Sequence, residues 1–179
     1  FDEVKKRGDT IVARPLITSA NIIWSFNPPT HLPQILLVKR AYAPFKDRWA
    51  LPETLLRSNE SAKIACIRLI KDKIGVQLSN SATEQLATFT NPQRVSGDRA
   101  LAIAYMTFLP VMPQLKAGYG ATEVRWFSLN FDHGDFLLQN GELVLGLSDD
   151  SPLAFDHHQI IGTAIRRIKN KLNYQPTIL

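Results

Sequence analysis

The chain has 179 residues, of which 45% are hydrophobic and 21% are charged, and its formal net charge is +5. This length fits one domain, and the apolar fraction excludes an intrinsically disordered chain. The single cysteine, Cys66, excludes a disulfide framework, and no apolar run is long enough to span a bilayer. We therefore predict a cytoplasmic domain with no membrane partner, whose basic surface favours an anionic ligand such as a phosphorylated small molecule or a nucleic acid.

The first part of the chain predicts two strands. Residues 1–14 are expected to be a charged lead-in. Residues 15–26 and 34–40 carry apolar runs that are typical of strands, and the continuous Ile-Leu-Leu-Val of the second run indicates a sheet covered on both faces. The proline-rich residues 27–33 between them predict a loop.

A helix is predicted for residues 61–74. Ser61 suits its N-cap, and Gly75 suits the position that ends it. The apolar residues of this helix spread over a wide arc, which predicts a helix packed between two layers.

The middle of the chain predicts more strands and a hairpin. Three further strands are expected at residues 84–90, 99–109 and 121–129. Asn140 and Gly141 stand between two apolar runs and predict a hairpin turn, because both positions of such a turn favour a positive φ. We expect this hairpin to form an insertion over residues 129–152.

Residues 155–173 predict a final amphipathic helix. Asp156 followed by Gln159 forms a capping-box pattern at its start. The apolar stripe of the helix consists of Ile160, Ile161, Ala164, Ile168 and Leu172. The order of strands, helix, strands and helix predicts the α/β class, as an α/β/α sandwich around a mixed β-sheet.

Residues 48–76 follow a spacing that resembles the signature box of the Nudix hydrolases. That signature is Gly, five residues, Glu, seven residues, and then Arg-Glu-aliphatic-x-Glu-Glu-x-Gly-aliphatic. The positions that match it are Glu60, Arg68, Ile70, Gly75 and Val76. Thr54 stands at the first Gly, and the three metal-binding Glu positions hold Leu69, Asp72 and Lys73. The resemblance implies a single Nudix-like domain over the whole chain, with a degenerate box.

The replaced positions bear on catalysis. In the Nudix family, as the resemblance implies, the acids hold Mg²⁺ ions that bridge a diphosphate and activate a water. Such hard cations need oxygen ligands, and acids at helix positions i, i+3 and i+4 share one face. Here Leu69 supplies no ligand, and Lys73 can either pair with Asp72 or occupy the place of the cation. We therefore expect no catalytic residue, no metal site and no required cofactor, with Mg²⁺ needed only for a residual hydrolase activity. Glu60, Arg68 and Asp72 would be the vestige of the box, with Glu60 and Arg68 paired to tie the preceding loop to the helix.

Four segments resemble one branch of this family in particular, the Nudix-related transcriptional regulators of NAD metabolism (the NrtR family). Residues 44–52 resemble their PFKG-WALPGG entry to the box, and residues 84–105 resemble their EQLYTFGDPxR…VSVAY segment. Residues 121–127 resemble their A-x-x-x-RWF, and residues 153–174 their LAFDHxxII…RLRGKLEY helix. The resemblance implies the effector domain of a bacterial regulator, catalytically inactive and homodimeric, which binds ADP-ribose or a related NAD-derived nucleotide. DNA would be contacted only through a separate winged-helix domain, which we expect to be absent or removed after residue 179.

A dinucleotide ligand needs cations for its pyrophosphate and a flat apolar surface for its adenine. Strand ends and loops around the box supply both kinds of side chain. The candidate ligand-binding residues are Arg40, Phe45, Lys46, Trp49, Arg94, Tyr105 and His157.

Two other functions stay open. A residual hydrolase of ADP-ribose or nucleoside diphosphates would use Asp72 together with Glu60 or Glu123. A dimerisation module without a ligand would use the hairpin and the basic C-terminal helix. The loss of acids at two of the three metal positions favours the sensor.

Overall fold

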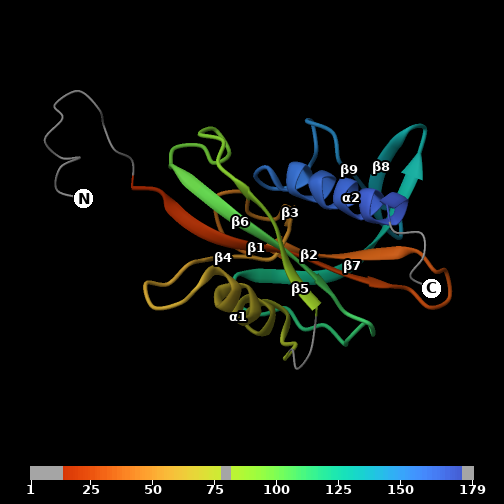
Figure 1. Cartoon of the computed structure of the whole chain (residues 1–179), viewed down its shortest axis with the longest axis horizontal. Helices are drawn as coiled ribbons and strands as arrows, with labels where there is room; N and C mark the ends of the chain where they lie inside the picture. Colours follow the sequence, from red (N-terminus) through yellow and green to blue (C-terminus); the bar gives the residue numbers. More distant parts are fainter. Residues whose placement is uncertain (1–13, 78–81, 175–179) are drawn as a thin grey trace, which may run out of the picture.

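The computed structural model describes residues 14–77 and 82–174 (Figure 1). The expected lead-in lies outside these residues, apart from Arg14. The helices of the described part are α1 (Ala62–Ile74) and α2 (His157–Tyr174). Its strands are β1 (Leu16–Phe26), β2 (Pro33–Arg40), β3 (Trp49–Ala50), β4 (Glu53–Leu55), β5 (Ala82–Phe89), β6 (Ala100–Phe108), β7 (Ala121–Asp132), β8 (Asp135–Asn140) and β9 (Leu143–Gly146). No helix of this part of the chain is long and apolar enough to cross a membrane.

The strands form one mixed sheet in the order β5-β6-β1-β2-β7-β8-β9, with β3 paired to β2 and β4 paired to β1. The long pairing of β1 with β6 is parallel, and the other pairings are antiparallel. The central position of β1 and β2 explains their apolar runs, because a central strand is covered on both faces.

The helices lie on opposite faces of the sheet, with α1 on one side and α2 on the other (Figure 1). Side chains alternate between the two faces along β2. Ile35 and Leu37 pack in the cluster that contains the α2 side chains, and Leu36 and Val38 pack in the cluster that contains Ile70 of α1. The predicted α/β/α sandwich around a mixed sheet is confirmed.

The ends of α1 are capped as the sequence predicts. The Ser61 hydroxyl accepts a hydrogen bond from the backbone N–H of Ile64 at 3.3 Å. Gly75 has a φ of 71°, and its N–H donates to the carbonyl of Lys71 at 3.0 Å. Glycine takes this left-handed conformation without the steric cost that a Cβ brings.

The predicted packing of α1 between two layers is wrong. The helix buries one face, with Ala65, Cys66, Leu69, Ile70 and Ile74 against the sheet. Ile64 and Ile67 lie on the outer face and are 56% and 41% exposed. The wide apolar arc of α1 therefore extends beyond what the sheet covers.

The predicted hairpin is present, but its turn is shifted by one residue. Asn140 pairs with Leu143, so the turn residues are Gly141, with a φ of 60°, and Glu142. The Asn140 side chain instead donates to the carbonyl of Trp126 at 2.9 Å. The hairpin strands β8 and β9 continue the main sheet from β7, which runs three residues beyond its predicted end.

The stripe predicted for α2 lies against the sheet. Ile160, Ile161 and Ala164 are buried, and Ile168 packs against the same cluster. The side chain of Leu172 lies outside the described residues. The capping box is not formed, because both carboxylate oxygens of Asp156 accept hydrogen bonds from Arg94.

Candidate functional site

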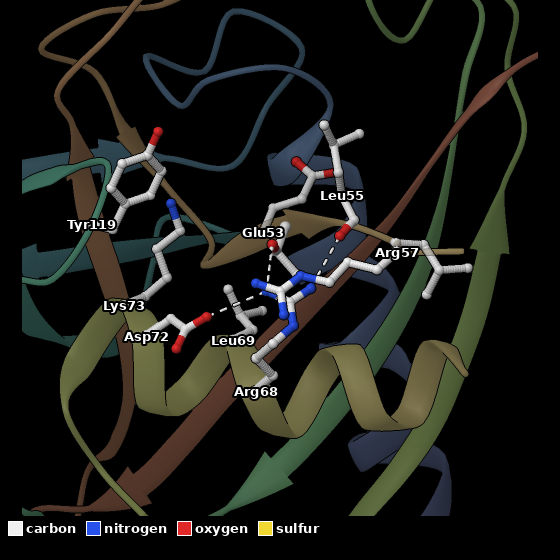
Figure 2. Close-up of a pocket in the computed structure, with 10 residues that line it drawn as sticks. Glu53, Leu55, Arg57, Arg68, Leu69, Asp72, Lys73 and Tyr119 are labelled. Carbon is white, nitrogen blue, oxygen red and sulfur yellow. Dashed lines mark hydrogen bonds and ion pairs between the residues drawn. The ribbon is translucent and has the colours of Figure 1, made fainter. Parts of the chain in front are cut away.

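A cleft of about 550 Å³ lies over the end of α1, between β4 and the loop that precedes β7 (Figure 2). Its wall is formed by Glu53, Thr54, Leu55, Leu56, Arg57, Arg68, Leu69, Asp72, Lys73 and Tyr119. Five of these ten residues carry a charge, and the cationic side chains outnumber the acidic ones. The cleft therefore suits a polar, anionic ligand.

Arg68 joins the helix to the loop before it. Its Nε and Nη2 donate to the two carboxylate oxygens of Glu60 at 2.9 and 2.6 Å, and Nη2 also donates to the carbonyl of Leu55 at 3.2 Å. The hydrogen bond from Arg68 is the main reason why the pKa of Glu60 falls to about 2. The predicted contact between Glu60 and Arg68 is thus confirmed, and it fixes the edge of the cleft.

The three residues at the metal-binding positions of the signature follow Arg68 on α1, and their side chains point in different directions. Leu69 is buried under the cleft. Asp72 turns back toward Arg68 and accepts from its Nη1 at 3.3 Å. Lys73 extends the other way, and its ammonium lies 5.6 Å from the centroid of the Tyr119 ring (Figure 2).

The loop that carries Tyr119 is docked on the end of α1. The N–H groups of Gly118 and Tyr119 donate to the carbonyls of Lys73 and Asp72 at 2.9 and 3.2 Å. These bonds satisfy carbonyls that a helix end leaves without an intrahelical partner. The loop backbone therefore sets the position of the Tyr119 ring at the cleft.

Replacing Gly118 by alanine is expected to lower the free energy of unfolding by about 1 to 3 kcal/mol, as overpacking does elsewhere. A Cβ at this position would overlap the carbonyl oxygen of Asp72, so the loop would have to leave the helix. Urea unfolding measures the effect. Gly146→Ala is the matched control, because its Cβ would meet no atom closer than 3.9 Å. Equal stability of the two variants would contradict the expectation.

Beneath the cleft lies a buried network of charged side chains. Its hub, Glu53, accepts a hydrogen bond from the Thr18 hydroxyl and lies 3.0 Å from Nε2 of His157. Arg94 lies 3.6 Å from Glu53, and its Nε and Nη2 donate to the Asp156 carboxylate at 3.0 and 2.9 Å. The network thus connects the floor of the cleft with the start of α2.

The hydrogen bonds of this network determine which ring nitrogen of His157 carries the proton, and they keep Glu53 ionised. Nδ1 of His157 accepts from the N–H of Leu51 at 2.9 Å, so Nε2 carries the proton that it donates to Glu53. Burial alone raises the pKa of Glu53, but the hydrogen bonds from His157 and Thr18 and the charge of Arg94 outweigh it and lower the pKa to about 2. Glu53 is therefore ionised at neutral pH.

None of the seven candidate ligand-binding residues lines this cleft. Trp49, Tyr105, Arg94 and His157 are buried, at 7%, 6%, 6% and 0% exposure. Lys46 is exposed on the loop after β2, and Phe45 is half-buried against Phe155. Arg40 lies beside the cleft, where its guanidinium stacks over the ring of Phe155 at 4.8 Å.

The sequence interpretation missed two exposed tyrosines at the site. Tyr119 is 80% exposed and Tyr42 is 61% exposed, with their ring centroids 6.4 Å apart. A signal for Tyr119 was present in the sequence. This residue stands between Gly118 and Gly120, which is typical of a loop and not of a buried strand or helix. Glu123, offered as a catalytic acid, pairs with Lys39 at 2.9 Å and with Arg125, and it does not line the cleft.

The NUDIX domain profile matches residues 16–131 of this chain. The chain belongs to the Nudix family. An ADP-ribose pyrophosphatase of Methanocaldococcus jannaschii is 29% identical over 133 residues, which are 74% of this chain and 66% of that protein. The ADPR responsive transcriptional repressor NtrR of Acinetobacter baylyi is 26% identical over 143 residues, which are 79% of this chain and 50% of the repressor.

A solved Nudix structure supports the same assignment. The crystal structure of a MutT/nudix family protein from Enterococcus faecalis matches with a TM-score of 0.84 and 28% sequence identity. The match covers 99% of this chain and 71% of that chain. Our chain thus spans about two thirds of the pyrophosphatase and half of the repressor.

The Mg²⁺ that the Nudix signature implies does not fit the residues at the three signature positions. Leu69 is an alkyl group, Lys73 is a cation, and the carboxylate of Asp72 is paired with Arg68. In the part of the chain that the structure describes, no group of three or more His, Cys, Asp or Glu could hold a metal ion. A Mg²⁺ site needs several oxygen ligands converging on one point, and this helix face presents one shared carboxylate.

Proposed function

We propose that this Nudix domain is the ligand-sensing part of a transcriptional regulator, and that it binds ADP-ribose or a related NAD-derived nucleotide without hydrolysing it. The main observation behind this proposal is the position of the cleft. It lies over the signature helix, where Leu69 and Lys73 replace two metal-binding acids. The similarity to both an ADP-ribose pyrophosphatase and an ADPR responsive repressor supports the nucleotide class.

The chemistry of the cleft suits such a ligand. Arg57 and Lys73 line the cleft, and Arg40 lies close enough to Lys73 for its charge to contribute, after burial, to lowering the pKa of Lys73. The positive charges of these side chains complement the negative charge of a pyrophosphate. A guanidinium group can also donate two parallel hydrogen bonds to the oxygens of one phosphate. The exposed rings of Tyr42 and Tyr119 offer the flat surface on which an adenine can stack.

DNA binding and self-association belong to the same proposal. Regulators act on DNA, and we propose that a separate winged-helix domain makes that contact. We also propose that the sensing domain is a homodimer. Analytical ultracentrifugation of the chain tests the second point, and a monomer at micromolar concentration would contradict it.

Calorimetric titration with ADP-ribose is expected to give micromolar affinity with no turnover of the ligand. Saturation at about a hundred times Kd should raise the free energy of unfolding by about 2.7 kcal/mol, because the ligand binds only the folded state. Adenosine is the control, since it lacks the diphosphate. If neither ADP-ribose nor NAD produces heat or a thermal shift, the sensing proposal is wrong.

A hydrolase is the second candidate, because the pyrophosphatase relative shares 29% of the aligned residues. The ionised carboxylate of Glu53 in the cleft wall is the observation that favours it. Chromatography of ADP-ribose incubated with the protein and Mg²⁺ or Mn²⁺ separates the two functions. We expect no AMP, whereas AMP release that disappears in Asp72→Ala would establish the hydrolase.

A further inference from the structure

Lys73 forms no ion pair among the residues that the structure describes. Asp72, its neighbour, is the carboxylate expected to neutralise it, but Asp72 is engaged by Arg68 at 3.3 Å. The lysine extends away from Asp72 and brings its ammonium to the ring of Tyr119 (Figure 2). A half-buried ammonium without a carboxylate partner loses hydration and gains little in return.

The backbone around this ammonium is shaped to leave room for it. The N–H of Gly118 donates to the carbonyl of Lys73 itself, which holds the loop against the helix. A Cβ on Gly120 would lie 2.7 Å from Nζ of Lys73, so a side chain at this position would crowd the ammonium. Gly120 also has a φ of 78°, a conformation that other residues rarely adopt.

A second cation approaches the same place. Arg40 ends β2, and the carbonyl of Gly120 accepts from the N–H of the next residue, Ala41, at 3.1 Å. Its guanidinium donates from Nε to the carbonyl of Pro44 at 2.8 Å, and no ion pair of Arg40 exists within the described residues. Partial burial and the charge of Arg40 lower the pKa of Lys73, against the smaller influence of Asp72 and Glu53. The two cations thus repel each other beside the cleft. Glu53 attracts both, but its carboxylate is held by His157, Thr18 and Arg94, so an anion between Arg40 and Lys73 would relieve the repulsion further.

We propose that Lys73, with Arg40 beside it, takes the place of the divalent cation of the Nudix signature and binds the diphosphate of a nucleotide directly. The inference rests on the proposed function for its ligand class, a nucleoside diphosphate. It assigns the charge neutralisation that Mg²⁺ supplies in the signature to a side chain on the same helix. Binding is then independent of divalent metal. An ammonium group carries no metal-bound water that could attack the diphosphate, which agrees with the proposed binding without hydrolysis.

The test is calorimetric titration of the chain with ADP-ribose, ADP and inorganic pyrophosphate, in EDTA and again in Mg²⁺. The wild type is expected to bind equally well in both buffers. Lys73→Met should weaken binding of all three ligands about tenfold to a hundredfold, the range for one charge-assisted hydrogen bond. Lys73→Arg should retain most of the affinity, and Lys73→Glu should bind only when Mg²⁺ is present.

Lys71→Met is the matched control, because Lys71 lies on the same helix, is exposed and does not line the cleft. Thermal unfolding of each variant shows that the helix is intact. Loss of wild-type binding in EDTA, or unchanged binding by Lys73→Met, would overturn the inference and leave the sensing function standing. Binding of pyrophosphate and ADP through Lys73, with none of ADP-ribose, would overturn the sensing function alone. No binding of any of the three ligands would overturn both.

Discussion

Replacing Arg94 by methionine is expected to lower the free energy of unfolding by about 3 to 5 kcal/mol, the range measured when one partner of a buried ion pair is removed. The Arg94 guanidinium is 1% exposed and forms ion pairs with two acids, Asp156 at 2.9 Å and Glu53 at 3.6 Å. Without it, two carboxylates stay beneath the cleft with no opposite charge. Urea unfolding followed by tryptophan fluorescence at neutral pH measures the loss.

Arg99→Met is the matched control for this variant. Arg99 lies five residues further along the same segment, and its guanidinium donates to the carbonyl of Ala100 at 3.4 Å. We expect this change to cost less than about 1 kcal/mol, because Arg99 is only half-buried and forms no ion pair among the described residues. In the double variant Arg94→Met/Asp156→Asn, the loss should be smaller than the sum of the single losses, because the two residues share one interaction. Additive losses, or a loss for Arg94→Met no larger than for Arg99→Met, would contradict the buried network.

The helices and strands were predictable where the sequence of the element itself shows its burial or its ends. The central strand β2 is covered on both faces, so its run of Ile-Leu-Leu-Val is continuous and identifies it. The caps of α1 are local, because Ser61 and Gly75 act on backbone groups within one turn. The strands β3 and β4 have two and three residues, which is too few for any periodicity in the sequence.

The site was predictable where its geometry lies within α1 and the loop directly before it. Asp72 and Lys73 follow Arg68 by four and five residues, about one helical turn, so helical spacing brings all three to the same cleft. Tyr105 and Trp49 were selected as stacking residues because they are aromatic and close to strand ends. The face on which each of them lies depends on strand register, and a shift of one residue exchanges the two faces. The register places both in the interior, which no local pattern in the sequence reveals.

Arg94 and His157 show a further limit of the sequence. Arg94, on a loop after the signature, and His157, at the start of the last helix, were predicted to contact a ligand. The structure instead places both against Glu53. Glu53 stands where the regulator motif WALPGG has the first of its two glycines. The carboxylate at this position gives Arg94 and His157 an internal partner. Glu53 therefore links the floor of the cleft to the start of α2 through its contacts with Arg94 and His157.

The stability of the domain is expected to fall as the pH drops from about 4.5 to about 2, and Glu53 accounts for a large part of that loss. The pKa of Glu53 is about 2 in the folded chain, against an ordinary value of 4.5. Because the folded pKa is the lower one, ionised Glu53 stabilises the fold at any pH above 4.5. That contribution, on the order of 3 kcal/mol, is lost as the carboxylate is forced to take up a proton.

Urea unfolding at several pH values between 2 and 7 measures this effect as a slope of stability against pH. Glu53→Gln should be less stable at pH 7 and should show a smaller slope below pH 4.5, because the variant has no proton to bind at this position. Glu142→Gln, on the exposed hairpin turn, is the matched control and should keep the wild-type slope.

Glu60 also has a pKa of about 2, so part of the slope will persist in Glu53→Gln and should be reduced again in Glu53→Gln/Glu60→Gln. An unchanged slope in Glu53→Gln would mean that the carboxylate is not held ionised by His157, Thr18 and Arg94. Above pH 5 the charge of Glu53 is constant, so any pH dependence of nucleotide binding in that range must come from other groups of the cleft or from the phosphates of the ligand.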